Sequence, residues 1–493
     1  MLSQLLKQRE MKYGFWLFFV LLFGHPVLKA QISITDNIPN EATLAPGSEV
    51  VNHPNATLFV VRNIYITGNK RTRPDIILRE LPFKSGDQYL LQDIVKKFQL
   101  AREQLMNTAL FHDVVVALKS FEGYNVDVLI EVKERWYLFP IPYFKPVDRN
   151  FNQWLVEQNA SLKRVNYGLK VLYNNTTGRN DKLRLWFVSG YTHQLSFSYD
   201  RLYIDKALKW GMSVNFAVGK TREVNYNTID NKQAFVKDSN QYLQNYLDAN
   251  VELTYRRAIK TRHRFGIGYH VQNIKDTIAN LNPSYFSEGR THISYPELYY
   301  AMSYFDLDYI PYPTKGYAAE VTFSKKGFNN IINSWQLSVK GSANWHLWPK
   351  TYLNLRSYST IKLPFKQPYF NQGLLGYNDV FMQGYEYYVI DGVAGGYMKA
   401  GITRELLSVK GNFLKRRRNE PLHIPLRVFG KIYGNAGYVY NPQPGDNFLV
   451  NEMLYSAGFG IDILTYYDFT IKLEVTFNQL GENGLFLHRK SNF

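Results

Sequence analysis

The chain has 493 residues, a net charge of +17, and an aromatic content of 16%. It contains no cysteine, which excludes a disulfide scaffold, a thiolate metal site, a Cys nucleophile and a lipid-modified N-terminal cysteine. With 20% charged and 45% hydrophobic residues, the composition is not that of a disordered chain. Aromatic residues favour strands and membrane interfaces, so the composition predicts a β-rich protein suited to a membrane.

The N-terminus has the features of an export signal. An apolar run over residues 14–23 follows Lys12, and about ten apolar residues are too few for a helix that spans a bilayer, which needs about 20. A basic flank, a short apolar core and a small residue at its exit predict a signal peptide over residues 1–30, with Met1 or Met11 as the start. The alternative is a buried core helix. No later run is long and apolar enough to predict a helical membrane span.

After a Pro- and Asn-rich lead-in over residues 31–57, residues 58–135 predict a small α+β module. Pro74 stands in the first turn of the first helix, where proline is well tolerated, and the second helix has one apolar face. The predicted order is β-α-α-β-β. The elements are strands over 58–66, 114–118 and 126–132, and helices over 74–80 and 90–106.

From residue 136 to residue 493 the sequence alternates between apolar and polar residues. A period of two places all apolar side chains on one face of a strand. In 467–479 the apolar members are Phe469, Ile471, Leu473, Val475 and Phe477.

About sixteen runs of this kind follow one another, an even number of the kind bacterial single-chain barrels use. Many are ten or more residues long, whereas soluble strands average about five or six and a tilted membrane strand needs about 9–11. Short turns alternate with long loops, with one exception at 190–193. We therefore predict an all-β transmembrane barrel of about 16 antiparallel strands. A soluble sandwich or propeller would need shorter strands or an internal repeat. The predicted long loops are 148–166, 223–241, 275–289, 364–395 and 440–452.

Several short motifs occur in the small module and in the β-rich region, and their order along the chain is informative. Gly68 and Asn69 begin a turn after the first strand of the small module. Met382, Gln383, Gly384 and Tyr385 lie in the long loop 364–395, five predicted strands before the end. The segments 433–437 and 458–462 lie on the two strands that follow the next hairpin turn. In this order, the motifs resemble those of the outer-membrane assembly and translocation barrels (the BamA/TamA-like bacterial surface antigen superfamily), whose periplasmic modules are polypeptide-transport-associated (POTRA) domains.

The resemblance implies a contact between the long loop and the barrel wall. In that family a loop arginine and a strand aspartate meet inside the barrel and hold the loop tip down, a contact called here the loop lock. In this chain the two positions are Gln383 and Asn435. Because a lone buried charge is costly, loss of one charge favours loss of the other, and two amides can still hydrogen-bond each other. We expect a neutral loop lock between Gln383 and Asn435; the alternative is a loop that has lost the lock.

Alternation also predicts which charged residues line the lumen. Asp462 and Glu474 are expected there as partners of the loop tip, and Lys399 as a generic lumen residue, because charges are expensive on a lipid-facing side. The chain ends on Phe493, and barrels of this kind resemble one another in ending on an aromatic residue that the assembly machinery reads. Pro140 and Pro142 lie in the first predicted strand. Since proline removes ladder donors, they are expected to weaken the seam between the first and last strands.

No catalytic motif or cofactor site is predicted. The chain lacks a Gly-x-Ser-x-Gly elbow, a phosphate loop and a His-Glu-x-x-His motif. The basic run 416–418 fits a solvated turn better than a nucleic-acid patch. By resemblance, the protein assists insertion or translocation of other proteins at the outer membrane of a Gram-negative bacterium, with the POTRA domain in the periplasm. The expected partners are outer-membrane lipids, unfolded client proteins and periplasmic chaperones or accessory assembly proteins. The alternatives are a passive pore or structural barrel, and an exporter of one dedicated client.

Overall fold

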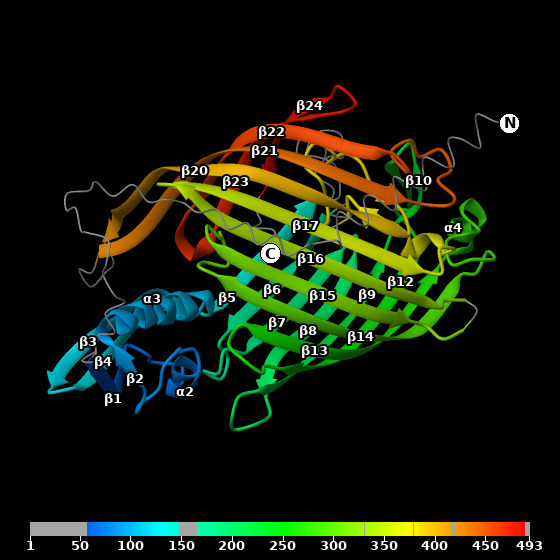
Figure 1. Ribbon diagram of the computed structural model, residues 1–493. Coiled ribbons are helices and arrows are strands. Elements are labelled where there is room, and N and C mark those ends of the chain that lie inside the picture. The colour runs from blue at the N-terminus through cyan, green and yellow to red at the C-terminus, as the bar shows by residue number, and fades with distance from the viewer. Residues whose placement is uncertain (1–56, 147–164, 330, 378, 416–420, 489–493) are drawn as a thin grey trace. The chain divides into compact units, whose positions relative to one another are not determined.

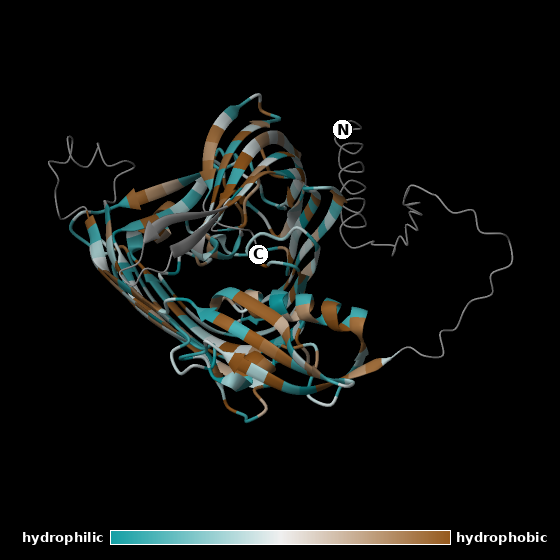
Figure 2. Cartoon of the chain, turned by 90° about the vertical axis from the view of Figure 1, so that its left-hand side faces the viewer, coloured by the Kyte–Doolittle hydropathy of each residue, from teal (hydrophilic) through white to brown (hydrophobic). Residues whose placement is uncertain are grey.

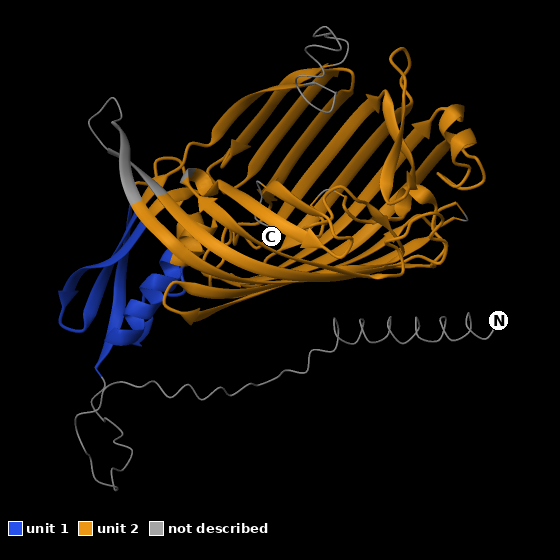
Figure 3. Cartoon of the chain, turned by 90° about the horizontal axis from the view of Figure 1, so that it is seen from above, with its two compact units in different colours: residues 1–67, 81–102, 114–131 blue, residues 68–80, 103–113, 132–493 orange. Residues whose placement is uncertain are grey.

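The structure is a computed structural model that describes residues 57–146, 165–329, 331–377, 379–415 and 421–488. The predicted signal peptide, most of the lead-in and Phe493 lie outside these residues. The described chain falls into two units, which Figure 3 distinguishes by colour. Unit 1 holds residues up to Thr67, Leu81–Arg102 and Val114–Glu131, and unit 2 holds the rest.

The N-terminal elements form a four-stranded sheet in the order β2-β1-β4-β3, in which β1 runs parallel to β4. The predicted order of strands and helices is confirmed, with one short added strand, β2, that pairs with the start of β1. The strand predicted over 114–118 is longer in the structure, where it is β3. The elements are β1 (Leu58–Thr67), α2 (Pro74–Leu78), β2 (Gln88–Leu90), α3 (Leu91–Asn107), β3 (Phe111–Glu122) and β4 (Asn125–Glu134).

A buried carboxylate joins three strands of this sheet. Asp127 of β4 is 3% exposed and accepts hydrogen bonds from Arg62 Nη2 at 2.7 Å and Arg62 Nε at 3.0 Å, both from β1. Ser120 Oγ of β3 donates to it at 3.0 Å. These bonds, that from Arg62 above all, hold the pKa of Asp127 well below its usual range. A buried carboxylate without such partners would be costly, so Asp127 favours this strand order.

The second sheet has sixteen strands, and each pairs with its neighbours in antiparallel fashion (Figure 1). They follow chain order from β5 to β24, which confirms the predicted barrel-like sheet of antiparallel strands. Its strands are β5 (Leu138–Pro146), β6 (Val165–Asn174), β7 (Lys182–Gly190), β8 (His193–Tyr203), β9 (Trp210–Thr221), β12 (Gln244–Tyr255), β13 (Thr261–Ile274), β14 (His292–Leu307), β15 (Gly316–Lys326), β16 (Ser334–Trp348), β17 (Thr351–Leu363), β20 (Ala394–Lys415), β21 (Pro421–Tyr440), β22 (Met453–Leu464), β23 (Thr470–Asn478) and β24 (Asn483–His488).

The two faces of this sheet are inverted relative to those of a water-soluble sheet. On β23, Lys472 is 6% exposed and Glu474 1%, whereas Leu473 is 40% and Phe477 49% exposed. Figure 2 shows the corresponding alternation of hydrophilic and hydrophobic residues along the strands. Charged residues are almost never buried next to exposed apolar ones in water-soluble folds; a polar inside and an apolar outside are expected of a wall that faces lipid.

None of the described helices has the length and apolar character needed to span a membrane.

Several predicted loops contain structure of their own. The loop after β9 carries a hairpin, the loop after β13 a short helix, and the loop after β17 a 3₁₀ turn and a two-stranded ladder. The hairpin β20–β21 has two long strands, of 22 and 20 residues. The added elements are β10 (Glu223–Ile229), β11 (Lys232–Lys237), α4 (Asp276–Leu281), η3 (Tyr369–Asn371), β18 (Gly373–Leu375), β19 (Ile390–Asp391) and η4 (Tyr466–Asp468).

Candidate functional site: the β17–β20 loop and the lumen wall

The β17–β20 loop, residues 364–393, packs onto the sheet through a buried apolar cluster. Gly373 and Leu375 of β18 pair with Asp391 and Ile390 of β19, which closes the base of the loop. The cluster combines loop residues with residues of β17, β20, β21 and β22, so the loop folds against the sheet wall. Its members include Tyr358, Leu374, Leu375, Met382, Tyr385, Tyr388, Ile390, Tyr397, Val439 and Leu454.

The loop tip, residues 382–385, is held by side chains of β22 and β23. Gln383 Nε2 donates to Glu474 Oε1 at 2.9 Å, and the Gln383 carbonyl accepts from Ser456 Oγ at 2.5 Å. The Gly384 carbonyl accepts from Asn478 Nδ2 at 2.8 Å. Met382 and Tyr385 are both 2% exposed. The tip predicted from sequence as a motif is therefore a docked element.

Only glycine fits at position 384 of the tip, because there is no room for a side chain and the backbone φ is positive. Its φ is +89°, and a Cβ there would lie 2.9 Å from Thr476 Cγ2 and 3.1 Å from Ser456 Cβ. A side chain would thus clash with two strands while adopting a conformation that L residues rarely take. The close approach lets the carbonyl of Gly384 reach β23.

Gln383 and Asn435 both lie at this junction, but the structure shows no hydrogen bond between their side chains. Asn435 Nδ2 donates to Ser456 Oγ at 2.9 Å, and Ser456 Oγ donates in turn to the carbonyl of Gln383. The Gln383 side chain points to Glu474 instead. Ser456, which the sequence did not single out, therefore links the Asn435 amide to the main-chain carbonyl of Gln383.

A shared lysine connects the two predicted lumen carboxylates. Lys431 Nζ of β21 lies 2.6 Å from Asp462 Oδ1 and 2.6 Å from Glu474 Oε1. Tyr312 donates its hydroxyl to Asp462 Oδ2 at 3.0 Å. Asp462 is 3% and Glu474 1% exposed. Sequence reasoning missed Lys431, although it shares the period-two phase of Asn435 on the same strand.

The last strand, β24, presents two inward side chains to the residues that flank the loop tip. The His488 ring lies 4.9 Å from that of Phe381, and the Phe486 ring 5.7 Å from that of Tyr387. His488 Nδ1 also contacts Glu474, and its Nε2 lies 3.5 Å from Glu386 Oε1. The residues on either side of the tip therefore contact β24, while the tip itself is held by β22 and β23.

The two remaining groups of predicted residues lie elsewhere. Pro140 and Pro142 are in β5, opposite Val171 and Leu169 of β6. In the small sheet, Gly68 takes a φ of +85° directly after β1, and Asn69 Nδ2 donates to the Thr72 carbonyl at 3.1 Å, so both form the predicted turn.

Comparison with known proteins identifies both regions. The family model "Surface antigen variable number repeat" (POTRA) matches residues 59–135, and the model "Omp85 superfamily domain" matches residues 175–465. No curated protein matches the chain.

Solved structures that match the chain include BamA from Haemophilus ducreyi lacking POTRA domains 1–3, with 15% identity, a TM-score of 0.44, and coverage of 87% of this chain and 83% of that one. CdiB from Escherichia coli has 11% identity, a TM-score of 0.50, and coverage of 87% and 75%. At this identity the likeness to CdiB concerns the fold alone. Because the Omp85 model covers more than half of the chain, the chain belongs to the Omp85 superfamily of outer-membrane barrels and carries a POTRA domain.

Proposed function

We propose that this protein assists the insertion or translocation of other proteins at the outer membrane, by offering strand edges to an unfolded client. In this proposal residues 1–30 are a signal peptide, residues 58–135 a periplasmic POTRA domain and residues 136–493 the barrel. Its partners are client polypeptides, outer-membrane lipids and periplasmic chaperones or accessory assembly proteins.

The observation that carries the proposal is the seam, defined as the free edges of β5 and β24. These strands stand at the two ends of the sixteen-strand order, and within the described residues no ladder joins them. β5 contains Pro140, Pro142 and Pro146, which have no N–H to give to a neighbouring strand. β24 is six residues long and pairs with β23. A weakly paired edge of this kind is a template for another strand.

The POTRA sheet supplies a second edge. β3 is the terminal strand of the order β2-β1-β4-β3 and runs for 12 residues. Val115 and Phe121 on this strand are 46% and 50% exposed. An extended client segment can add to such an edge through main-chain hydrogen bonds.

A reversible cross-link across the seam tests the proposal. The natural chain has no cysteine, so cysteines introduced at Phe144 of β5 and Leu485 of β24 can be joined with a cleavable bismaleimide. The full-length protein in lipid vesicles is then given an unfolded barrel client, and protease-protected client is measured. Because the client must enter at the seam, we expect cross-linking to lower client folding about tenfold and cleavage to restore it.

The matched control is the same cross-link between cysteines at Phe197 and Phe216, which face each other in the paired strands β8 and β9. It should leave client folding unchanged. Client folding that is equal with the seam closed and open contradicts the proposal. A steady conductance in planar bilayers, unaffected by client, would then favour the passive pore.

A further inference from the structure

Three cationic side chains in the lumen wall make no direct hydrogen bond or ion pair in the described structure, although Glu474 lies close enough to Lys399 and Lys472 to attract them electrostatically. Within the described residues, no hydrogen bond or ion pair engages the side chains of Arg356, Lys399 or Lys472. Lys399 and Lys472 are each 6% exposed. A buried charge without a partner is costly, so this group needs an explanation outside the contacts already described.

The strand register makes the group more costly. Arg356 of β17 stands directly opposite Lys399 of β20, and like charges at directly opposite positions destabilise a sheet. Lys472 stands opposite Asp462, but that carboxylate already contacts Lys431 and Tyr312. The register therefore concentrates positive charge in one part of the wall.

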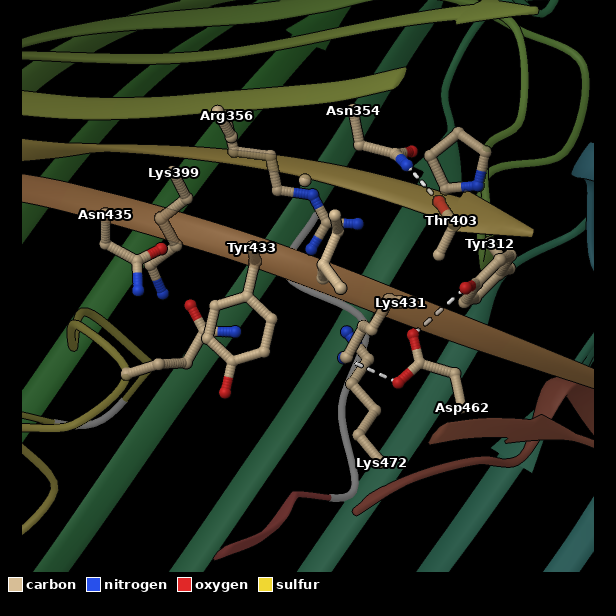
Figure 4. A pocket seen from close by; sticks show the side chains of 15 residues that line it. Tyr312, Asn354, Arg356, Lys399, Thr403, Lys431, Tyr433, Asn435, Asp462 and Lys472 are labelled. Atoms are coloured by element: carbon tan, nitrogen blue, oxygen red, sulfur yellow. Dashed lines mark hydrogen bonds and ion pairs between the residues drawn. The ribbon is translucent and has the colours of Figure 1, made fainter. Parts of the chain in front are cut away.

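These side chains converge on one cavity. Figure 4 shows Arg356, Lys399, Lys431 and Lys472 reaching into the space that Asp462, Asn435 and Tyr433 also border. Its volume is about 70 Å³, and since a water needs roughly 10–15 Å³ on this scale, the cavity has room for about five waters or one small oxyanion. Four cations and one carboxylate line it.

The Lys399 amine is buried at the cavity between two aromatic rings. Its Nζ has no hydrogen-bond acceptor and lies 4.5 Å from the ring centroids of both Phe381 and Tyr397. Cation–π contacts of this length favour the charged amine. They leave its N–H donors available to an anion.

Two amide oxygens at the cavity lack a donor. Gln383 Oε1 and Asn435 Oδ1 are buried without partners. Their orientation is set by their surroundings: Gln383 must present Nε2 to the Glu474 carboxylate, and Asn435 must donate to Ser456, whose own hydrogen goes to the Gln383 carbonyl. An anion that carries O–H groups would satisfy these acceptors as well as the cations.

We propose that Arg356, Lys399 and Lys472 form a binding site for phosphate, with Gln383 and Asn435 accepting from its O–H. The planar Arg356 fork suits paired phosphate oxygens, and the two lysines act as point charges. Bound phosphate would offset the Arg356–Lys399 repulsion and link β17, β20 and β23 to the loop tip. The site is independent of the protein-insertion role.

Titration calorimetry of the full-length protein in detergent with inorganic phosphate, at ionic strength held constant with NaCl, tests the site. We expect saturable binding, weakened at least tenfold in both Lys399→Met and Arg356→Met. The control Lys340→Met removes the same charge from an exposed lysine of β16 whose nearest carboxylate is 4.0 Å away, and should bind phosphate like the unmodified protein.

Each remaining outcome decides one part of the proposal. The site is overturned if the unmodified protein shows no saturable phosphate binding. It is also overturned if Lys399→Met and Arg356→Met bind phosphate as tightly as the unmodified protein does. If one variant fails to fold, the other decides. Sulfate, which has no O–H at neutral pH, should bind more weakly than phosphate; equal binding overturns the role given to the two amides. Glycerol phosphate in a parallel arm shows whether the site takes a phosphate group carried on a larger molecule or the free anion.

Discussion

At the scale of single residues, Gly384 offers the sharpest test of loop docking. Alanine at this position would place a Cβ 2.9 Å from Thr476 Cγ2 at a φ of +89°. The backbone conformation alone costs about 1 kcal/mol, and the clash adds about 1–3 kcal/mol. We expect Gly384→Ala to release the loop tip, measured as faster protease cleavage within the β17–β20 loop of the protein in lipid vesicles.

Gly445 provides the matched control, because its φ is +58° and nothing lies within 4 Å of its Cβ position. Gly445→Ala imposes the backbone cost without the clash, and should leave cleavage of the β17–β20 loop unchanged. Equal cleavage in Gly384→Ala and the unmodified protein would show that the tip is not held by close contact at this residue.

Sequence reasoning at the residue level could use only a motif or a period. Alternation placed Asp462 and Glu474 inside, and the motif placed Gln383 at the tip. The partner of Gln383 was not predictable, because Glu474 lies 91 residues away, and its reach depends on the register of β22 and β23 with the loop. The expected bond to Asn435 is replaced by the link through Ser456.

At the scale of elements, β24 depends on its inward side chains. It pairs with β23 alone among the described strands, and Phe486 packs against Tyr387 of the loop. A ring pair of this kind contributes about 0.5–1.5 kcal/mol. We expect Phe486→Ala to speed amide hydrogen exchange in residues 483–488 by up to about tenfold, measured by mass spectrometry on the vesicle-bound protein.

Leu487 is the control on the same strand. It is 69% exposed and points away from the loop, so Leu487→Ala should leave exchange in β24 close to that of the unmodified protein. If both substitutions speed exchange equally, the β17–β20 loop does not hold β24.

Long strands were predictable because a period of two repeats many times along them. The short elements in the loops were not, because few residues carry any period there. β18 and β19 pair through Gly373–Asp391 and Leu375–Ile390, and the buried cluster around Leu374 and Tyr385 stabilises them. Their existence depends on tertiary packing that no local pattern records.

At the scale of the whole molecule, many aromatic residues lie on the outer face of the sheet, whereas part of the positive charge lies on its inner face. Apolar and aromatic side chains such as Phe265 and Tyr317 are 46% and 51% exposed on the outer face of the strands. Part of the charge lies inside, where Arg356, Lys399, Lys431 and Lys472 line one cavity. Composition predicted a β-rich membrane protein, but only the strand register shows that these cations meet.

The inverted faces give a direct test of membrane insertion. Ile267 of β13 is 56% exposed and stands between Val251 and Leu298, which are 41% and 44% exposed. Arginine at this position would face lipid and cost about 2–4 kcal/mol near the bilayer midplane, whereas an arginine that faces water would cost little.

Leu281 on α4 is 50% exposed outside the sixteen-strand sheet, so Leu281→Arg is the control. We expect Ile267→Arg alone to lower the free energy of unfolding by urea from lipid vesicles, followed by tryptophan fluorescence; equal, small effects of both substitutions would contradict a lipid-facing wall.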